Sequence, residues 1–175
     1  MLSTTDQVKG KNMPIRDDDR RHTNGRDTNR KGVSTHLAVA QRLVALGYEV
    51  LQPFDPSLPY DLAFVAQTSN GWFRSAKPIL YRVQCKTAHL STDNRYGGGK
   101  GCICINAYHS GGRLPGNRGG YWGKAEYIGA YSPDTGKVYL IPVMEFPNGR
   151  EIRLRIEKPK NGQESRIHWA KDYEL

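Results

Sequence analysis

Several features common in other protein classes are missing from this sequence of 175 residues. No apolar run approaches the ~18 residues that a membrane-spanning helix needs, and the N-terminus lacks the apolar core of a secretory signal. Cysteine is scarce: Cys85, Cys102 and Cys104 are an odd number, which suits a reducing compartment better than a disulfide framework. No second Cys or His pair matches the spacing of Cys102 and Cys104, so we predict a buried strand there and not a zinc site. An intracellular protein without a membrane partner is expected.

Acidic residues are absent from one long stretch, residues 95 to 124. Ten of the nineteen glycines fall within it, and glycine lets backbone N–H groups approach phosphates closely. Tyrosine and tryptophan are interleaved with its basic residues, and such aromatic side chains can stack on bases. Together with the net charge of +9, this stretch favours loops that contact DNA. The alternative is a pair of flexible loops that are basic by chance. The basic residues are Arg95, Lys100, Arg113, Arg118 and Lys124.

Residues 1 to 30 have almost no apolar periodicity and carry many charges. Such a segment cannot bury enough surface to offset the entropy lost on ordering. We therefore predict a mobile N-terminal arm over residues 1–30, followed by a single domain over residues 31–175. That length is sufficient for one hydrophobic core.

The remaining pattern predicts an α/β protein with a mixed sheet. A helix is expected from Ser34 to Leu46, with Leu37, Ala40 and Val44 on one apolar stripe, Leu43 beside it, and Gly47 ending the helix. The C-terminal residues 167–173 are expected to form a closing turn that seats Trp169 in the core. Strands are predicted at residues 48–52, 59–65, 81–87, 102–106, 127–131, 137–142 and 152–156.

Two of these strands bring reactive groups into one arrangement. The period of two places Arg82, Gln84 and Lys86 on one face of the strand over residues 81–87. If this face meets Asp61, a carboxylate, an amide and an ammonium group converge, which suits metal-assisted cleavage better than a packed core. Each residue also has an ordinary structural explanation: Asp61 could cap a turn, Gln84 could be a satisfied sheet residue, and Lys86 an exposed strand lysine.

Asp61, followed about two dozen positions later by Gln84-x-Lys86, resembles the PD-(D/E)xK nuclease signature. It looks most like the branch in which glutamine replaces the second acid, which includes some group I intron homing endonucleases. The resemblance implies a restriction-endonuclease-like core: a central mixed β-sheet flanked by helices, an αβββ opening and a later crossover helix. Short sequence motifs around the signature also follow the order found in that branch: Lys31-Gly32, Gly47-Tyr48-Glu49-Val50, Pro53, Tyr60-Asp61-Leu62, Val83-Gln84-Cys85-Lys86-Thr87 and Tyr127-Ile128-Gly129-Ala130-Tyr131.

The resemblance also implies a role for each residue of the cluster. Asp61 would be the main metal ligand, with the amide oxygen of Gln84 and the backbone carbonyl of Cys85 completing the set. Lys86 would position or activate the attacking water. His36 stands where similar nucleases carry a glutamate. The resemblance therefore does not decide between one metal ion and two. We assign His36 an accessory role, in contacting phosphate or moving a proton. The expected ion is Mg²⁺, with Mn²⁺ as a substitute.

The leading hypothesis is a Mg²⁺-dependent endonuclease that hydrolyses double-stranded DNA, and specifically a site-specific homing endonuclease. Lys31 is included among the expected DNA contacts. The resemblance also implies a homodimer or higher symmetric homo-oligomer, because such enzymes cut both strands of a duplex. The expected place is the cytoplasm or nucleoid of a bacterial or phage-infected cell, or an organelle. The alternatives are a restriction, repair or junction-resolving nuclease, and a DNA-binding protein with a defunct nuclease site. An RNA-processing nuclease is not favoured, because the sequence has no RRM or KH motif.

Overall fold

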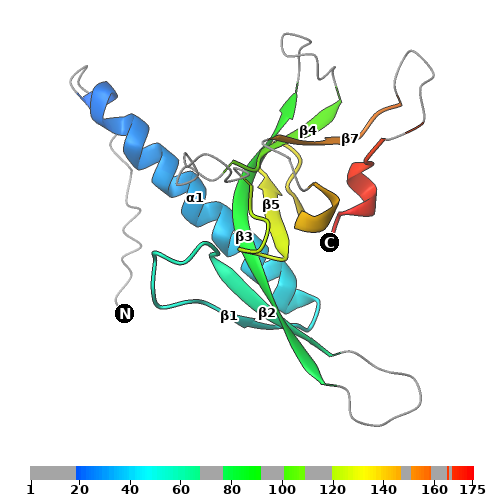
Figure 1. Cartoon of the computed structure of the whole chain (residues 1–175). Coiled ribbons are helices and arrows are strands. Elements are labelled where there is room, and N and C mark those ends of the chain that lie inside the picture. Colours follow the sequence, from blue (N-terminus) through cyan, green and yellow to red (C-terminus); the bar gives the residue numbers. More distant parts are fainter. Residues whose placement is uncertain are drawn as a thin grey trace, which may run out of the picture.

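One long strand, β3 (Pro78–Ser91), runs the length of the molecule and organises the sheet around it (Figure 1). The computed structural model describes residues 19–67, 77–91, 101–108, 120–146, 151–158, 165 and 167–175, with side chains from residue 27 onward. No helix in these ranges is long and apolar enough to span a membrane. The other elements are α1 (Asp19–Ala45), β1 (Glu49–Leu51), β2 (Leu62–Gln67), β4 (Cys102–Asn106), β5 (Tyr127–Ser132), β6 (Lys137–Pro142), the 3-10 turn η1 (Val143–Glu145), β7 (Glu151–Arg155) and the 3-10 turn η2 (Ala170–Asp172).

The strands that pair with β3 change along its length. Its first part, up to Val83, pairs with β2 in antiparallel register, and its last part, from Ala88, pairs with β4. Between them, residues 83–87 pair in parallel with β5. Among the described strands, β5 is thus the only partner of residues 84–87, and the other edge of β3 carries no strand there. The sheet is mixed, as predicted.

Helix α1 lies against one side of this sheet. Val39 and Leu43 are fully buried and form a cluster with Val83 of β3. The hydroxyl groups of Thr35 and Thr87 lie 2.7 Å apart, so a partly buried hydrogen bond also joins the helix to β3. Because neighbouring strand residues face opposite sides of a sheet, Gln84 and Lys86 lie on the other side of the strand from Val83 and Cys85.

The helix differs from its prediction in two respects. It begins at Asp19 and not at Ser34, so residues 19–30 of the predicted arm are helical, while residues 1–18 lie outside the described residues. Extending a helix costs far less than starting one, so polar turns can continue a packed helix. The buried stripe is also different: Leu37 and Val44 are 65% and 59% exposed, since the core contacts come from Thr35, Val39 and Leu43.

The end of α1 and most of the strands agree with the sequence. Gly47 has φ of +86°, and the Tyr48 N–H donates to the Leu43 carbonyl, as in a Schellman end. All seven predicted strands occur within a few residues of their expected bounds. The C-terminal turn is present, but Ala170 and not Trp169 is buried in the core, because a small side chain fits the space beside Tyr139. No crossover helix lies between β3 and β5 in residues 101–108 and 120–126.

Gly129 of β5 offers a sharp test of the contact between helix and sheet. A Cβ atom at this position would lie 2.7 Å from Cγ1 of Val39 and 2.9 Å from Cγ1 of Val83. We expect Gly129→Ala to lower the free energy of unfolding by about 1–3 kcal/mol, because overpacking forces these side chains apart. Urea unfolding measures it. Gly32→Ala is the matched control, since nothing lies within 4 Å of Gly32 and alanine favours helix by up to about 1 kcal/mol. Equal stability of the two variants would show that α1 does not pack closely on β5.

Candidate active site

Asp61 lies immediately before β2, at the point where β2 stops pairing with β3. Its backbone N–H donates to the carbonyl of Val83 at 2.9 Å. Its Oδ2 accepts the backbone N–H of Cys85 at 2.8 Å. The carboxylate therefore takes the place of the next strand residue and satisfies an N–H group on the open edge of β3.

The side chain of Gln84 completes a compact group with Asp61. Its Nε2 donates to Asp61 Oδ2 and lies 3.4 Å from the backbone carbonyl oxygen of Cys85. The Gln84 amide, the Asp61 carboxylate and the Cys85 carbonyl are thus gathered around one point at the sheet edge. All three residues are only partly buried.

Lys86 follows on the same side of β3 as Gln84. Its Nζ lies 5.1 Å from the centroid of the Tyr121 ring, a distance at which an ammonium is attracted to the ring face. Tyr121 is only 4% exposed and belongs to the core, so its ring is a fixed support. The ring fixes the ammonium group on the same side of β3 as Gln84, and no ion pair joins it to an acidic side chain of the described residues.

The thiol of Cys85 is not available as a metal ligand. Its side chain packs with the cluster under α1. Burial, and secondarily the Asp61 charge, raises the pKa of the Cys85 thiol far above its usual range, so the group stays protonated. Among the described residues, no group of three or more His, Cys, Asp or Glu side chains is arranged to hold a metal ion. The site thus has one carboxylate, that of Asp61, with the Cys85 carbonyl oxygen and the Gln84 amide beside it.

Comparison with known proteins identifies a family and a fold. A family model described as PD-(D/E)XK endonuclease matches residues 26–175. The chain belongs to that endonuclease family. No curated protein matches the chain. The solved structure of a bacterial homing endonuclease, I-Ssp6803I, has the same fold: 24% sequence identity, a TM-score of 0.53, and coverage of 84% of this chain and 86% of that one.

The other residues singled out in this PD-(D/E)XK endonuclease are more dispersed. His36 is half-buried on α1, and no hydrogen bond or ion pair joins it to Asp61, Gln84 or Lys86 in the described part. Its accessory role stays a prediction. Lys31 is exposed on α1, and Lys124 is half-buried in the turn after Tyr121. Four of the predicted DNA contacts lie outside the described residues: Arg95, Lys100, Arg113 and Arg118.

Sequence reasoning missed two contacts that support the site of the endonuclease. One is the Tyr121 ring beneath Lys86, which is separated from it by many residues and carries no motif. The other is the ion pair between Arg82 and Glu126, whose Nη2 and Oε1 atoms lie 2.6 Å apart. The Arg82 backbone N–H also donates to Glu126 Oε2 at 2.7 Å. Hydrogen bonds from Arg82 lower the pKa of Glu126, so this carboxylate stays ionised.

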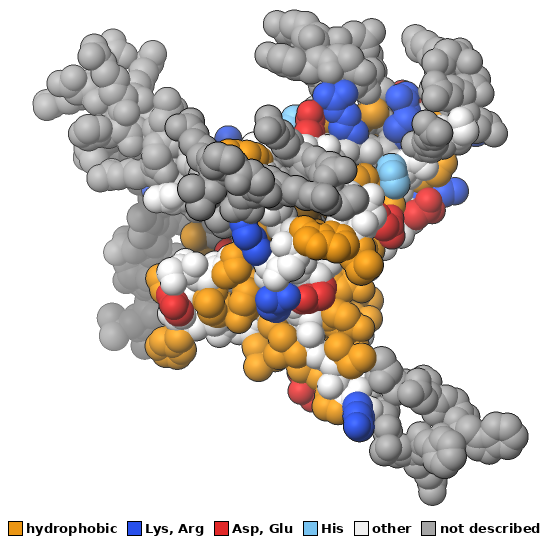
Figure 2. All heavy atoms as spheres, in the orientation of Figure 1, with side chains coloured by type: hydrophobic (Ala, Val, Ile, Leu, Met, Phe, Trp, Pro, Cys, Tyr) orange, Lys and Arg blue, Asp and Glu red, His pale blue; other side chains and the backbone are white. Residues whose placement is uncertain are grey.

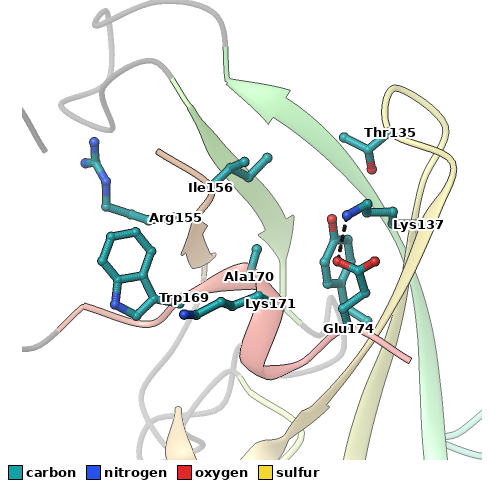
Figure 3. Close-up of a pocket in the computed structure, with 9 residues that line it drawn as sticks. Thr135, Lys137, Arg155, Ile156, Trp169, Ala170, Lys171 and Glu174 are labelled. Carbon is teal, nitrogen blue, oxygen red and sulfur yellow. Dashed lines mark hydrogen bonds and ion pairs between the residues drawn. The ribbon is translucent and has the colours of Figure 1, made fainter. Parts of the chain in front are cut away.

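Two surface hollows of the endonuclease lie away from Asp61 and Gln84. One, of about 160 Å³, is enclosed by the C-terminal segment, β6 and the end of β7 (Figure 3). There the Trp169 ring lies beside Arg155, and Lys137 is paired with Glu174 at 2.8 Å. The other, of about 390 Å³, is a groove beside the turn that contains Trp122.

The substitution Gln84→Glu tests whether the side chains at positions 61 and 84 lie as close together as described. A second carboxylate directly against that of Asp61 should lower the free energy of unfolding by about 1 kcal/mol at neutral pH, because like charges oppose each other. In this variant the pKa of the introduced carboxyl is raised in the folded state. The penalty is therefore full at pH 7 and disappears as the pH falls below the ordinary carboxyl range. Urea unfolding between pH 4 and 8 measures it.

Gln67→Glu is the matched control, since the exposed Gln67 at the far end of β2 is opposite Pro78 and no carboxylate. Mg²⁺ should raise the melting temperature of Gln84→Glu and leave that of Gln67→Glu unchanged. If both variants lose the same stability with the same pH dependence, the two side chains do not share a site.

Proposed function

We propose that this chain is a metal-dependent endonuclease that hydrolyses phosphodiester bonds in double-stranded DNA. One observation carries the proposal: the Asp61 carboxylate, the Gln84 amide and the Cys85 carbonyl surround one point, with the Lys86 ammonium next on the same side of the strand. The family membership supplies the reaction class.

The donor set fits a hard divalent cation. Mg²⁺ prefers oxygen ligands and is bound through one or two carboxylates together with water and substrate phosphates. Asp61 and the Cys85 carbonyl present oxygen already. A half-turn of the terminal Gln84 amide exchanges its nitrogen for its oxygen, since the two ends have nearly the same shape. Mg²⁺, with Mn²⁺ as a substitute, is the ion we assign to Asp61, Gln84 and Cys85; when bound it neutralises phosphate charge and lowers the pKa of a bound water.

Lys86 has a separate part in the proposal. Its ammonium is on the same side of β3 as Gln84 and contacts the Tyr121 ring, and within the described ranges it forms no ion pair. It is therefore free to bind a phosphate oxygen or the attacking water, and to offset negative charge that develops in the transition state. The residue contributes orientation and charge, and Asp61 and Gln84 contribute the cation site.

Two finer features belong to the same proposal. The structural neighbour is described as a homing endonuclease, and the net charge of +9 suits long contact with a DNA backbone. We therefore propose a site-specific homing endonuclease that acts as a symmetric homo-oligomer, with one active site for each strand. A restriction, repair or junction-resolving nuclease of this fold is the alternative. Mapping the ends produced from a library of random duplexes distinguishes them, because only a homing endonuclease requires one long sequence.

The direct test is cleavage of duplex DNA by purified protein. We expect nicked and linear products with Mg²⁺ or Mn²⁺ and none with EDTA. Asp61→Ala and Lys86→Ala should each reduce the rate at least 100-fold, because each removes a group that acts on the phosphate. Both should still bind DNA within a few fold of the unmodified protein.

Lys158→Ala is the control for loss of one positive charge, since Lys158 is exposed just beyond β7. It should cleave normally. Full activity of Asp61→Ala or Lys86→Ala would reject the assigned site. Binding without any cleavage by the unmodified protein, with both ions tested, would favour a DNA-binding protein whose nuclease site is defunct.

A further inference from the structure

Trp122 is a large aromatic side chain held out of a tightly fixed turn. Its own exposure is 52%, whereas the preceding Tyr121 is buried in the core. The carbonyl of Tyr121 accepts the backbone N–H groups of Lys124 and Ala125, at 2.9 and 3.1 Å. Gly123 has φ of +72°, which favours glycine there. The backbone on both sides of Trp122 is thus constrained.

Arg82 fixes the same turn from the side of the sheet. Its Nη2 donates to the Gly123 carbonyl at 3.4 Å and to Glu126 Oε1 at 2.6 Å. The Glu126 N–H returns a bond to the Arg82 carbonyl at 3.0 Å. This network holds the turn that carries Trp122 against the strand that carries Gln84 and Lys86. A rigid exposed aromatic loses little conformational entropy when it binds a partner.

The turn also joins Trp122 directly to the residue that supports Lys86. Tyr121, its neighbour in the chain, is the residue whose ring lies 5.1 Å from Lys86 Nζ. The exposed indole of Trp122 is therefore one position along the chain from Tyr121, whose ring supports Lys86. In the proposed function, the Lys86 ammonium meets the scissile phosphate.

A groove of about 390 Å³ opens beside Trp122. Hydrophobic side chains also gather in the middle of the face shown in Figure 2. Glu126 is the only charged residue in the groove lining, and its charge is offset by Arg82. The lining residues are Tyr81, Trp122, Gly123, Ala125, Glu126, Tyr127, Pro142, Val143 and Met144.

We propose that Trp122 and this groove hold an unstacked nucleobase of the DNA strand being cut. Aromatic surfaces bind bases of any sequence through their π-faces, and the neutralised lining does not repel the strand. Lys86 and Lys124 flank the turn with positive charge that suits the adjoining phosphates. This inference rests on the proposed function, because it takes the cleaved strand to pass over Lys86.

The test measures binding of a labelled 30-nucleotide single strand and a labelled 30-bp duplex in EDTA, by fluorescence anisotropy. We expect Trp122→Ala to weaken single-strand binding roughly 5- to 100-fold, the range observed when a stacking aromatic is removed. Trp122→Phe should recover most of the affinity, since a smaller ring still stacks. Duplex binding should weaken less, because a paired base must first be unstacked.

The salt dependence separates stacking from charge. Loss of a phosphate contact lowers the slope of log Kd against log salt concentration, whereas loss of stacking leaves the slope unchanged. Phe54→Ala is the matched control, because Phe54 is a fully exposed aromatic on the connection between β1 and β2; its affinity should equal that of the unmodified protein. Unchanged binding by Trp122→Ala, a reduced slope, or an equal loss in Phe54→Ala would overturn the inference.

Three further outcomes are informative. If Trp122→Ala lowers the mass of the DNA-free protein in sedimentation, a second copy covers the groove and the proposed occupant is wrong. If the unmodified protein cleaves duplex DNA while Trp122→Ala binds single strands normally, only this inference fails. If Trp122-dependent binding persists but Mg²⁺ and Mn²⁺ yield no cleavage, the stacking site stands and the nuclease function fails.

Discussion

The hydrogen bond from the Cys85 N–H to the Asp61 carboxylate is the contact on which the site depends. It exists because β2 stops pairing at Leu62 and leaves one edge of β3 open over the next residues. If β2 extended further, its backbone would pair with the Cys85 N–H, and no side-chain carboxylate could bind there. The same carboxylate holds the Gln84 amide, which in turn reaches the Cys85 carbonyl. The end of a strand, and not a loop or a deep cavity, therefore brings the oxygen donors together.

The two sides of β3 have separate tasks. Residues at odd positions, such as Val83 and Thr87, contact α1 through apolar packing and one partly buried hydroxyl pair. Residues at even positions carry the amide and ammonium groups. The helix thus fixes the strand from one side, while Asp61 and the Tyr121 ring hold the polar side chains on the other. Arg82 extends this arrangement by fixing the turn that supplies the Tyr121 ring.

Local patterns sufficed to predict the strands and the end of α1, because alternation, turn residues and a glycine with positive φ act over a few residues. They did not predict which stripe of α1 is buried. The helix has two apolar stripes, through Val39 and Leu43 and through Leu37 and Val44, and only the packed sheet selects between them. The pairing of Asp61 with Gln84 followed from family resemblance. The contacts of Lys86 with Tyr121 and of Arg82 with Glu126 join distant segments of different strands and turns, so no local pattern could predict them.

The charge balance of the proposed site connects it to the rest of the surface. Asp61 and Lys86 carry opposite single charges and Gln84 is neutral, so these side chains together have no net negative charge to attract a divalent cation. Phosphate oxygens of the substrate must then supply part of the attraction, since Mg²⁺ commonly keeps such ligands. Cation binding and DNA binding would be coupled, each raising the affinity for the other by the same factor. A strongly basic chain increases the local concentration of DNA phosphate. In the proposed site, the net charge of +9 would thus compensate for the weak attraction of a single carboxylate for the cation.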